Sequence, residues 1–287
     1  MNSEILVIIV TFNGMQWLQR CIGSVRSSSE PADILAIDNG STDGSVEWLR
    51  SHGVDVVVNS ANLGFGAANN IGLRRAVEEG YSYAYLLNQD AWVLPDTFSK
   101  LLGGFEDKTY GILSPVQYDG GGKKMDRQFA RRCKKYLRQE KEAQVVEVPF
   151  VMAAHWMIGR GCFMKTGGFS PAFKHYGEDD NYLDRARWHG FRCGVVPAAG
   201  AIHDRAGRKE TPERRMFLKC NASVINISKP GRGLLWRMFK EPLRLVGIGC
   251  LHFSKAPFKF IGPLMKRYPE LIRYRKLSRK SGAFLKN

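Results

Sequence analysis

The stretch that decides the fold is residues 83–96, which read YAYLLNQDAWVLPD. Residues 84–87 are a continuous apolar run, which is typical of a strand covered on both faces. Asp90 follows this run, and Pro95 then suits the start of a helix. Because ligands of open α/β sheets bind beyond the carboxyl ends of the strands, Asp90 is expected where a metal or a phosphate-bearing ligand would bind. The alternative is that Asp90 only caps a turn.

Strands and helices alternate upstream of this stretch and just after it. Further strands are predicted at residues 5–10, 34–37 and 54–58. Helices are predicted at residues 15–25, 46–49, 66–79 and 96–105. This alternation indicates an α/β fold with a mainly parallel central sheet flanked by helices. Gly64 and Gly66 do not complete a G-x-G-x-x-G sequence and follow the third strand, so a dinucleotide-binding fold is disfavoured.

Polar side chains follow each predicted strand. Thr11 and Asn13 follow the first strand, Asp38 the second and Asn59 the third. A carboxylate such as Asp38 can accept hydrogen bonds from a pyrimidine N–H or a ribose hydroxyl. Mg²⁺ or Mn²⁺ takes only one or two protein carboxylates beside phosphate oxygens and water, so Asp90 would suffice to hold a cation. The strand ends therefore predict a rim suited to a nucleotide and a divalent cation.

A cluster of acids lies in residues 175–187, which read HYGEDDNYLDRAR. Glu178, Asp179 and Asp180 stand at the start of a helix predicted over residues 178–190. A carboxylate in such a place can deprotonate a sugar hydroxyl as the hydroxyl attacks. The structural alternative is that the three acids only stabilise the positive end of the helix dipole.

A histidine follows a short strand predicted at residues 195–196, in the sequence His203-Asp204-Arg205. A lone histidine is more often a satisfied core residue than a metal ligand. The metal-ligand interpretation of His203 is favoured by the presence of Asp90, because a second ligand opposite Asp90 would complete a cation site with phosphate and water.

Residues 111–149 carry a weaker pattern than the rest. Within them, residues 123–141 form a basic segment, for which we expect a surface loop with a helix. Such a segment can line a substrate cleft, and a merely solvated helix face is an equally good interpretation.

The positive charge is concentrated in the last part of the chain. Residues 1–204 hold 22 Lys or Arg against 23 Asp or Glu, whereas residues 205–287 hold 21 against 4. This basic tail is rich in aromatic residues, and Pro242, Pro257 and Pro263 are expected to break it into short helices. Such segments lie on anionic membrane surfaces, or pack on the core with their cations in water.

Cysteines and apolar runs bound the cellular setting. The six cysteines include no C-x-x-C pair, which disfavours a zinc knuckle or a disulfide framework and fits a reducing cytoplasm. The first apolar run is too short for a signal peptide, and residues 245–253 fall far below the roughly 20 residues that span a bilayer. We therefore expect a cytoplasmic protein whose tail contacts the inner face of the plasma membrane.

Six motifs occur in a fixed order, ILVIIVTFN, DNGSTDGS, NLGFGAANNIG, NQD, GEDDNYLDRARWHGF and HDR. In this combination, over residues 4–208, the chain resembles the family 2 glycosyltransferases of the GT-A fold, most closely their rhamnosyltransferase-like branch. The resemblance implies transfer of a sugar such as rhamnose from a nucleoside diphosphate to a hydroxyl, with inversion at the anomeric carbon. It also implies a dTDP- or UDP-linked donor, Mn²⁺ or Mg²⁺ as cofactor, and a lipid-linked or growing cell-surface glycan as acceptor.

The resemblance assigns roles by position. The catalytic base falls on Asp179 with Glu178 supporting, and it could slip by one residue to Asp180, because Asn181 departs from the family pattern. Asp90 and His203 would bind the metal. The expected donor-binding residues are Thr11, Asn13, Asp38, Asn62, Gly64, Asn70, Asn88, Asp90 and Arg205.

The expected domains are a glycosyltransferase domain at residues 1–208 and a basic helical extension at residues 209–287. The first divides into a nucleotide-binding half at 1–105 and an acceptor and catalytic half at 106–208. Two other functions stay open, a nucleotidyltransferase and a nucleic-acid- or lipid-binding protein with an inactive α/β core. Nucleic acid is the less favoured partner of the tail.

Overall fold

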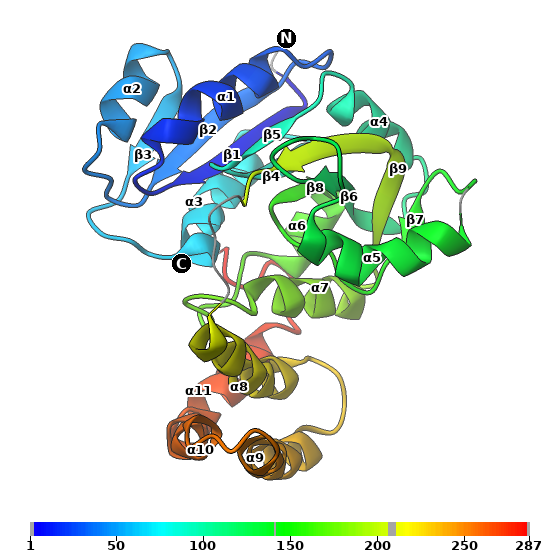
Figure 1. Ribbon diagram of the computed structural model, residues 1–287. Coiled ribbons are helices and arrows are strands. Elements are labelled where there is room, and N and C mark those ends of the chain that lie inside the picture. Colours follow the sequence, from blue (N-terminus) through cyan, green and yellow to red (C-terminus); the bar gives the residue numbers. More distant parts are fainter. Residues whose placement is uncertain (1–2, 141, 206–210, 286–287) are drawn as a thin grey trace.

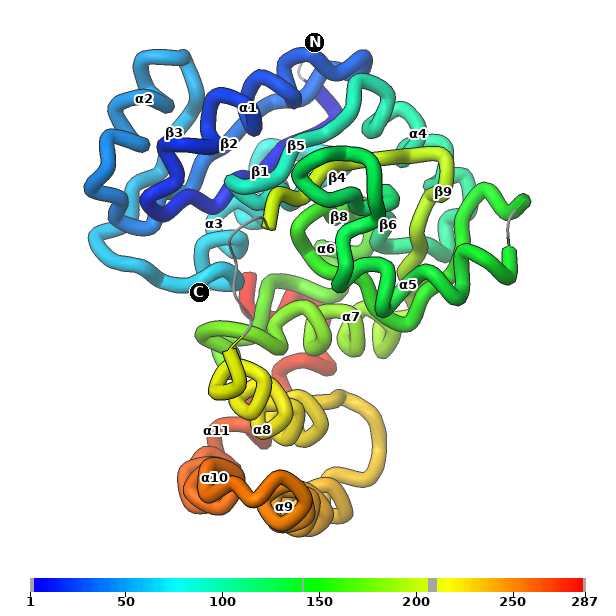
Figure 2. The backbone as a smooth tube through the Cα atoms, viewed as in Figure 1, coloured from blue at the N-terminus to red at the C-terminus, as the bar shows by residue number. Residues whose placement is uncertain are grey.

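The computed structural model describes residues 3–140, 142–205 and 211–285. A sheet with helices on both faces forms a sheet lobe, and helices from the last part of the chain form a helical lobe below it (Figure 1). The chain passes down into the helical lobe and returns to end beside the sheet lobe (Figure 2). The expected domain boundary after residue 208 lies outside the described residues.

The described strands form one sheet in the order β3-β2-β1-β4-β8-β6-β9-β5, with β7 paired to β9. The parallel half contains β1 (Ile5–Thr11), β2 (Asp33–Asp38), β3 (Asp55–Val58) and β4 (Tyr83–Asn88). β8 (His155–Gly159) joins antiparallel to β4 and to β6 (Tyr110–Tyr118), and β6 pairs in parallel with β9 (Arg192–His203). The short strands β5 (Ala91–Val93) and β7 (Val146–Glu147) run antiparallel to β9. Parallel pairs make up most of the register, as predicted.

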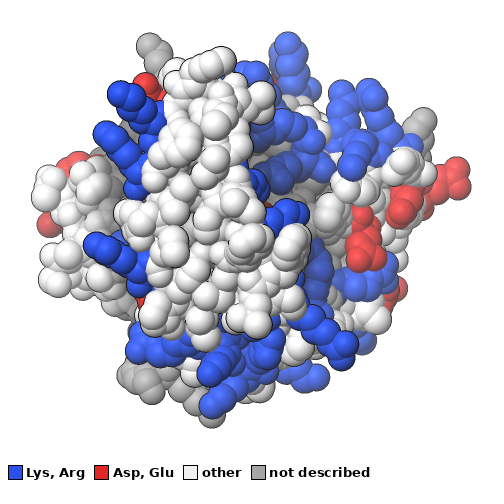
Figure 3. Space-filling view, turned by 90° about the horizontal axis from the view of Figure 1, so that it is seen from below, with Lys and Arg blue, Asp and Glu red and all other residues white. Residues whose placement is uncertain are grey.

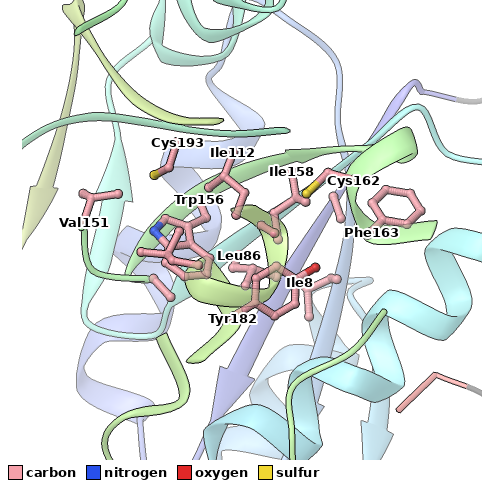
Figure 4. Packing of buried hydrophobic residues seen from close by; sticks show 14 of the residues in the cluster. Ile8, Leu86, Ile112, Val151, Trp156, Ile158, Cys162, Phe163, Tyr182 and Cys193 are labelled. Atoms are coloured by element: carbon pink, nitrogen blue, oxygen red, sulfur yellow. The ribbon is translucent and has the colours of Figure 1, made fainter. Parts of the chain in front are cut away.

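Two hydrophobic layers explain why the strands have continuous apolar sequences. On β1, Ile5, Val7 and Ile9 face one layer, and Leu6 and Ile8 face the other. The first layer packs against α1 (Met15–Arg26), α2 (Ser45–Ser51) and α4 (Thr97–Gly104). The second packs against α3 (Phe65–Glu78), α5 (Arg127–Gln139), α6 (Arg160–Thr166) and α7 (Glu178–Trp188), and Figure 4 shows its centre. The sheet is therefore buried on both sides.

The second half of the sheet differs from the prediction. β6 begins at Tyr110, where the weaker pattern predicted no strand, and the predicted strand at residues 195–196 is part of the much longer β9. Pro115 and Gln117 interrupt the apolar pattern of β6, and the register with β9 shifts between Pro115 and Val116. The expected helix in the basic segment is confirmed as α5, capped by Asp126.

The helical lobe consists of α8 (Pro212–Ser228), α9 (Leu234–Leu251), α10 (Ala256–Lys266) and α11 (Tyr268–Leu277). Pro242 lies inside α9 and Pro263 inside α10, so the expectation that these prolines break the helices is wrong. A proline in a helix removes one backbone hydrogen bond and bends the helix, and tertiary packing can offset that loss. Leu245 and Leu264, on the same two helices, are buried in the core of this lobe.

The end of the chain is attached to the sheet lobe. The backbone N–H of Gly168 donates to the carbonyl of Ala283 at 2.8 Å, and that of Gly282 donates to the carbonyl of Lys165 at 3.0 Å. Leu285 is buried in the second hydrophobic layer of the sheet. A side chain at Gly167 would collide with the Ala283 backbone. The helical lobe is thus fastened to the sheet lobe by the residues that follow α11.

The underside of the helical lobe is apolar at its centre and basic at its edges. Figure 3 shows a broad uncharged area flanked by lysine and arginine side chains. Large exposed apolar side chains of α9, α10 and the turn between them are Leu235, Trp236, Phe239, Leu243, Val246, Leu251, Phe253, Phe258 and Met265. We call these residues the apolar face. Within the described ranges, no helix combines the length and the apolar content needed to cross a bilayer.

Candidate functional site

A cavity of about 460 Å³ lies at the carboxyl ends of β1 and β4. Its other walls come from α5, from the start of α7 and from α8. Small-molecule sites typically measure about 300–1,000 Å³, so the cavity can hold a substrate. The predicted site residues that line it are Asn62, Gly64, Asn88, Asp90, Glu178, Asp179, Asp180 and Arg205. Thr11, Asn13, Asp38, Asn70 and His203 lie outside its lining.

Strand pairing brings Asp90 and His203 together. β5 runs antiparallel to β9 with Ala91 opposite His203. Nε2 of His203 lies 3.5 Å from Oδ1 of Asp90, and the side chains are 0% and 2% exposed. The backbone N–H of Asp204 donates to the carbonyl of Asp90 at 2.8 Å, which fixes the same turn.

Neighbouring groups hold His203 in place from two sides. Nε of Arg205, a cavity residue, lies 3.3 Å from Nδ1 of His203. Behind it, the buried His155 receives a hydrogen bond from the Tyr85 hydroxyl and donates one to the carbonyl of Ile202. Burial lowers the pKa of His155 to about 3, so this ring stays neutral. The buried His155 therefore ties β4, β8 and β9 together beneath the site.

The donor chemistry of Asp90 and His203 fits a divalent cation. One carboxylate oxygen and one imidazole nitrogen are ligands that Mn²⁺ accepts, and Mg²⁺ or Mn²⁺ in such sites completes its shell with phosphate oxygens and water. In the parts of the chain that the structure describes, no cluster of three or more His, Cys, Asp or Glu could hold a metal. Asp90 and His203 would thus be the two ligands that the described residues supply.

The three acids of α7 all face the cavity. Gly177, at φ 95°, ends the preceding turn, and Glu178, Asp179 and Asp180 form the first turn of α7. Burial and then the neighbouring charge of Glu178 raise the pKa of Asp179 well above its ordinary value. The N–H of Ala153, which donates to Oδ2 at 3.1 Å, opposes that rise.

The two flanking acids differ from Asp179 in their surroundings. Burial raises the pKa of Glu178 and that of Asp180, and the positive charge of Arg132 opposes the rise at Asp180. Oε2 of Glu178 is buried and has no hydrogen-bond partner in the described part of the chain. Burial thus raises the pKa of all three acids, the predicted base Asp179 among them.

Asp38 and Thr11 support a loop instead of lining the cavity. The buried carboxylate of Asp38 accepts hydrogen bonds from the Thr11 hydroxyl at 2.8 Å, from the Ser41 hydroxyl at 2.6 Å, and from the backbone N–H groups of Gly40 and Ser41. Its neighbour Asn39 lines the cavity in its place. Asp38 therefore shapes the loop that begins with Asn39, at the edge of the cavity.

Asn13 takes part in the same loop. Its φ of 47° lies in the left-handed region, and Oδ1 accepts a hydrogen bond from the backbone N–H of Thr42 at 2.9 Å. The Asn13 backbone N–H donates to the hydroxyl of Ser41 at 2.8 Å. Asn13 thus joins the loops that follow β1 and β2.

Asn62 and Gly64 form a tight turn at the cavity edge. Oδ1 of Asn62 accepts a hydrogen bond from the backbone N–H of Gly64 at 2.9 Å. Gly64 has φ 84°, and a Cβ there would lie 2.6 Å from the carbonyl oxygen of Lys174. Only glycine satisfies both conditions. Close by, Nδ2 of Asn88 lies 3.5 Å from Nε2 of His203.

Asn70, an expected donor contact, has its side-chain amide bonded to the backbone of Phe169. Its Oδ1 accepts from the backbone N–H of Phe169 at 2.6 Å, and its Nδ2 donates to the carbonyl of Phe169 at 2.9 Å. The whole amide is therefore used to hold the Phe169 backbone, away from the cavity lining.

Several cavity residues were missed as site residues by the sequence analysis. Gln128, Arg131 and Arg132 of α5 line the cavity, whereas the other basic side chains of this helix are exposed outside it, so each interpretation of the basic segment holds for part of the helix. Arg214 and Tyr176 also line it. The density of arginines in the segment was the available signal, but nothing in the sequence showed that α5 and α8 meet at one cavity.

Comparisons with known proteins agree with this arrangement. A sequence model of glycosyl transferase family 2 matches residues 6–167. The N-acetylglucosaminyl-diphospho-decaprenol L-rhamnosyltransferase of Mycobacterium tuberculosis is 24% identical over 72% of this chain and 78% of its own length. A low-salt glycan biosynthesis hexosyltransferase of Haloferax volcanii is 20% identical over 71% of this chain and 68% of its own length.

Solved structures show the same fold. A mannosyltransferase from Pyrobaculum calidifontis, in complex with GDP-Man and Mn²⁺, superposes with a TM-score of 0.61 at 18% identity, over 97% of this chain and 84% of its own. GalNAc-T7 with UDP, GalNAc and Mn²⁺ gives a TM-score of 0.58 at 18% identity, over 80% of this chain and 51% of its own. The fold is the GT-A fold that the sequence motifs predicted.

Proposed function

This chain belongs to glycosyl transferase family 2, and on that premise we propose that it transfers a sugar, with inversion, from a nucleoside diphosphate to an acceptor hydroxyl in the cavity described above. The observation that carries the proposal is that Asp90, backed by His203, and the acids of α7 line one cavity of substrate size. Asn39 and Asn88, which line the cavity at the ends of β2 and β4, and the Asn62–Gly64 turn would hold the nucleotide.

The reaction is a direct displacement in which Asp179 acts as the general base. Asp179 takes the proton of the acceptor hydroxyl while that oxygen bonds to the anomeric carbon and the bond from this carbon to the diphosphate breaks. The raised pKa of Asp179 supports this role, because a base works best when its pKa lies near the working pH. Glu178 keeps that pKa high by its neighbouring charge.

Asp90 and His203 would hold Mn²⁺ or Mg²⁺, whose charge stabilises the leaving diphosphate when the cation is bound. Arg205, within 3.3 Å of His203, places a second positive charge on the same side of the cavity. Two similar solved structures contain Mn²⁺, which supports the assignment of a divalent cation.

The comparisons suggest the class of each substrate. The mycobacterial relative acts on an acceptor joined to decaprenol through a diphosphate, and it transfers L-rhamnose by name. We propose the same classes here, a dTDP- or UDP-linked sugar, rhamnose first, as donor and a lipid-linked glycan as acceptor. Such an enzyme would work at the cytoplasmic surface of a membrane.

The apolar face supports contact with an anionic membrane. Phe253 is 99% and Leu235 82% exposed, although both are apolar. Basic side chains flank the face (Figure 3), and each lysine or arginine near an anionic bilayer contributes about 1 kcal/mol of attraction. Apolar side chains that enter the lipid boundary, ringed by cations, are typical of proteins that lie on membranes without crossing them.

A donor screen tests the proposed function. The protein is incubated with Mn²⁺ or Mg²⁺ and a panel of nucleotide sugars, and the released nucleotide is identified. Slow release of a nucleoside diphosphate from one donor is the expected result. Release of pyrophosphate from a sugar phosphate and a nucleoside triphosphate would instead indicate a nucleotidyltransferase. Absence of either reaction, with salt-sensitive retention on nucleic acid, would indicate the binding protein with an inactive core.

A further inference from the structure

Three arginines in the cavity wall come from helices that carry none of the predicted donor-binding residues. Arg131 and Arg132 lie on α5, and Arg214 lies on the first turn of α8. Basic side chains elsewhere on these helices do not line the cavity, which includes Arg138 of α5 and Arg215 of α8. These two helices therefore direct three of their basic side chains to the cavity and the others elsewhere.

Aromatic rings position the guanidinium groups of Arg132 and Arg214, which have no hydrogen-bond partner among the described residues. Arg132 stacks over the ring of Phe150 at 4.6 Å, and Arg214 over the ring of Tyr176 at 4.9 Å. Stacking on an aromatic face restrains a guanidinium while its N–H groups remain available in the ring plane. None of the three forms a side-chain hydrogen bond or ion pair with the residues that the structure describes, and the Nε of Arg214 is buried without such a partner.

The arginines lie beside the acids of α7. The charge of Arg132 acts on Asp180, the residue next to Asp179. Tyr176, on which Arg214 stacks, lies just before the first turn of α7. Asp90 and His203, in contrast, sit on the β5–β9 pair with Arg205. The cavity thus has one cationic group near the expected leaving diphosphate and another near the base.

We propose that Arg131, Arg132 and Arg214 form a phosphate subsite for the acceptor, so that the acceptor carries a phosphate or diphosphate close to the sugar whose hydroxyl reacts. The inference rests on the proposed function, since it takes Asp179 as the group that meets the acceptor hydroxyl. Planar guanidinium groups pair with phosphate oxygens through two parallel hydrogen bonds, which gives orientation as well as affinity. A neutral glycan acceptor would leave these three charges without a partner.

Binding without metal separates this subsite from the donor site. The probe is N-acetylglucosaminyl diphosphate on a short prenyl chain, and the reference is the same sugar and chain without the diphosphate. Calorimetry is done with excess chelator, which removes the metal-dependent part of donor binding. The wild-type protein should bind the probe at least tenfold more tightly than the reference.

Substitutions locate the binding energy. Arg214→Ala and the pair Arg131→Ala/Arg132→Ala should each weaken probe binding about tenfold, or about 1.4 kcal/mol, because each change removes charge-assisted hydrogen bonds to the phosphate. The matched controls Arg215→Ala and Arg138→Ala should change it less than twofold. Arg214→Lys should restore only part of the affinity, since it keeps the charge and loses the planar geometry. Circular dichroism of each variant checks that the fold is intact.

Two results would overturn the subsite. One is equal binding of probe and reference by the wild-type protein, and the other is unchanged probe binding in both arginine variants. A rise in the donor KM in these variants, with probe binding unaltered, would assign the arginines to the donor and would equally refute the proposal. Donor hydrolysis by the wild-type protein is measured in parallel. Its absence would refute the proposed function alone, because probe binding does not depend on turnover.

Discussion

His203 directs its Nε2 toward Oδ1 of Asp90 at 3.5 Å, and protein encloses both side chains almost completely. Antiparallel pairing of β5 with β9 sets these two residues opposite each other, although a large part of the chain separates them. An imidazole and a carboxylate in this arrangement can together bind a divalent cation.

Removal of either proposed metal ligand, Asp90 or His203, should weaken the dependence of donor binding and hydrolysis on Mn²⁺. Asp90→Ala should abolish Mn²⁺-dependent donor binding, and His203→Ala should raise the Mn²⁺ concentration at half-maximal donor hydrolysis at least tenfold. Binding of the nucleotide sugar is measured by calorimetry at several Mn²⁺ concentrations and with chelator. His52→Ala, an exposed change on the sheet lobe, is the control. Donor binding by Asp90→Ala that responds normally to Mn²⁺ would exclude this site.

Loss of the base should stop transfer without loss of the donor. Asp179→Asn keeps the shape of the side chain and its acceptor oxygen for the Ala153 N–H, so donor binding should change less than threefold. The transfer rate should fall by about 10²–10⁴, the usual contribution of general base catalysis. Asp184→Asn is a matched control on the same helix, since Asp184 pairs with Arg187 outside the cavity. Near-normal transfer by Asp179→Asn would move the base to Glu178 or Asp180.

The same substitution should stabilise the protein at neutral pH. The pKa of Asp179 is raised in the folded state, so its protonated form stabilises the fold. This stabilisation is fully present below the ordinary aspartate pKa, and it is lost as pH rises through the raised pKa. Asn carries no such proton. Asp179→Asn should therefore gain stability over the wild type as pH rises, by about 1.4 kcal/mol for each pH unit between the unfolded and folded pKa values.

Urea denaturation from pH 4 to pH 8 measures this difference in the free energy of unfolding. The acidic limb of the transfer rate should lie at the same raised pKa. A constant stability difference across the pH range would show that Asp179 titrates normally, whatever its role in transfer.

Asn70 should matter for stability more than for substrate. Asn70→Ala leaves the backbone N–H and carbonyl of Phe169 without their partners, and each unsatisfied buried group costs about 1–3 kcal/mol. Thermal denaturation should show a clear drop in melting temperature, whereas the donor KM of the folded fraction should be unchanged. A raised donor KM at unchanged stability would restore Asn70 as a donor contact.

The apolar face should control membrane binding. Replacing Trp236, Phe239 and Phe253 by Ser should reduce binding to vesicles that contain anionic lipid by more than tenfold, because a fully buried large apolar side chain contributes about 1.5–3 kcal/mol. Val58→Ser, on the exposed edge of the sheet lobe, is the control. Co-sedimentation with anionic and with neutral vesicles measures the apolar and the electrostatic contributions to membrane binding. Equal sedimentation of the triple variant would exclude the face as a membrane contact.

The sequence sufficed for the first half of the sheet because each strand there is a short apolar run closed by a polar residue. β1, β2, β3 and β4 lie where those runs predicted. It failed at β6, where Pro115 and Gln117 break the apolar run and only the neighbouring strands make the segment extended. Tertiary pairing decided that strand, and sequence periodicity does not report it.

The candidate site was partly visible for a similar reason. The acids of α7 and the Asp90–His203 pair could be proposed from local motifs, and the structure places them at one cavity or directly beside it. The burial of Asp38 by four hydrogen-bond donors depends on how the loops after β1 and β2 fold together. Such long-range relationships leave no signature in a single sequence.

The attachment of Ala283 to Gly168 has a practical consequence for experiments on the tail. Leu285, near the C-terminus, packs in the second hydrophobic layer of the sheet. A protein that lacks the tail would lose this contact and expose apolar surface on the sheet lobe, far from the deleted helices. Truncated forms would then report on folding and aggregation, and a loss of lipid affinity in them would be ambiguous. Single substitutions on the outer helices avoid that difficulty.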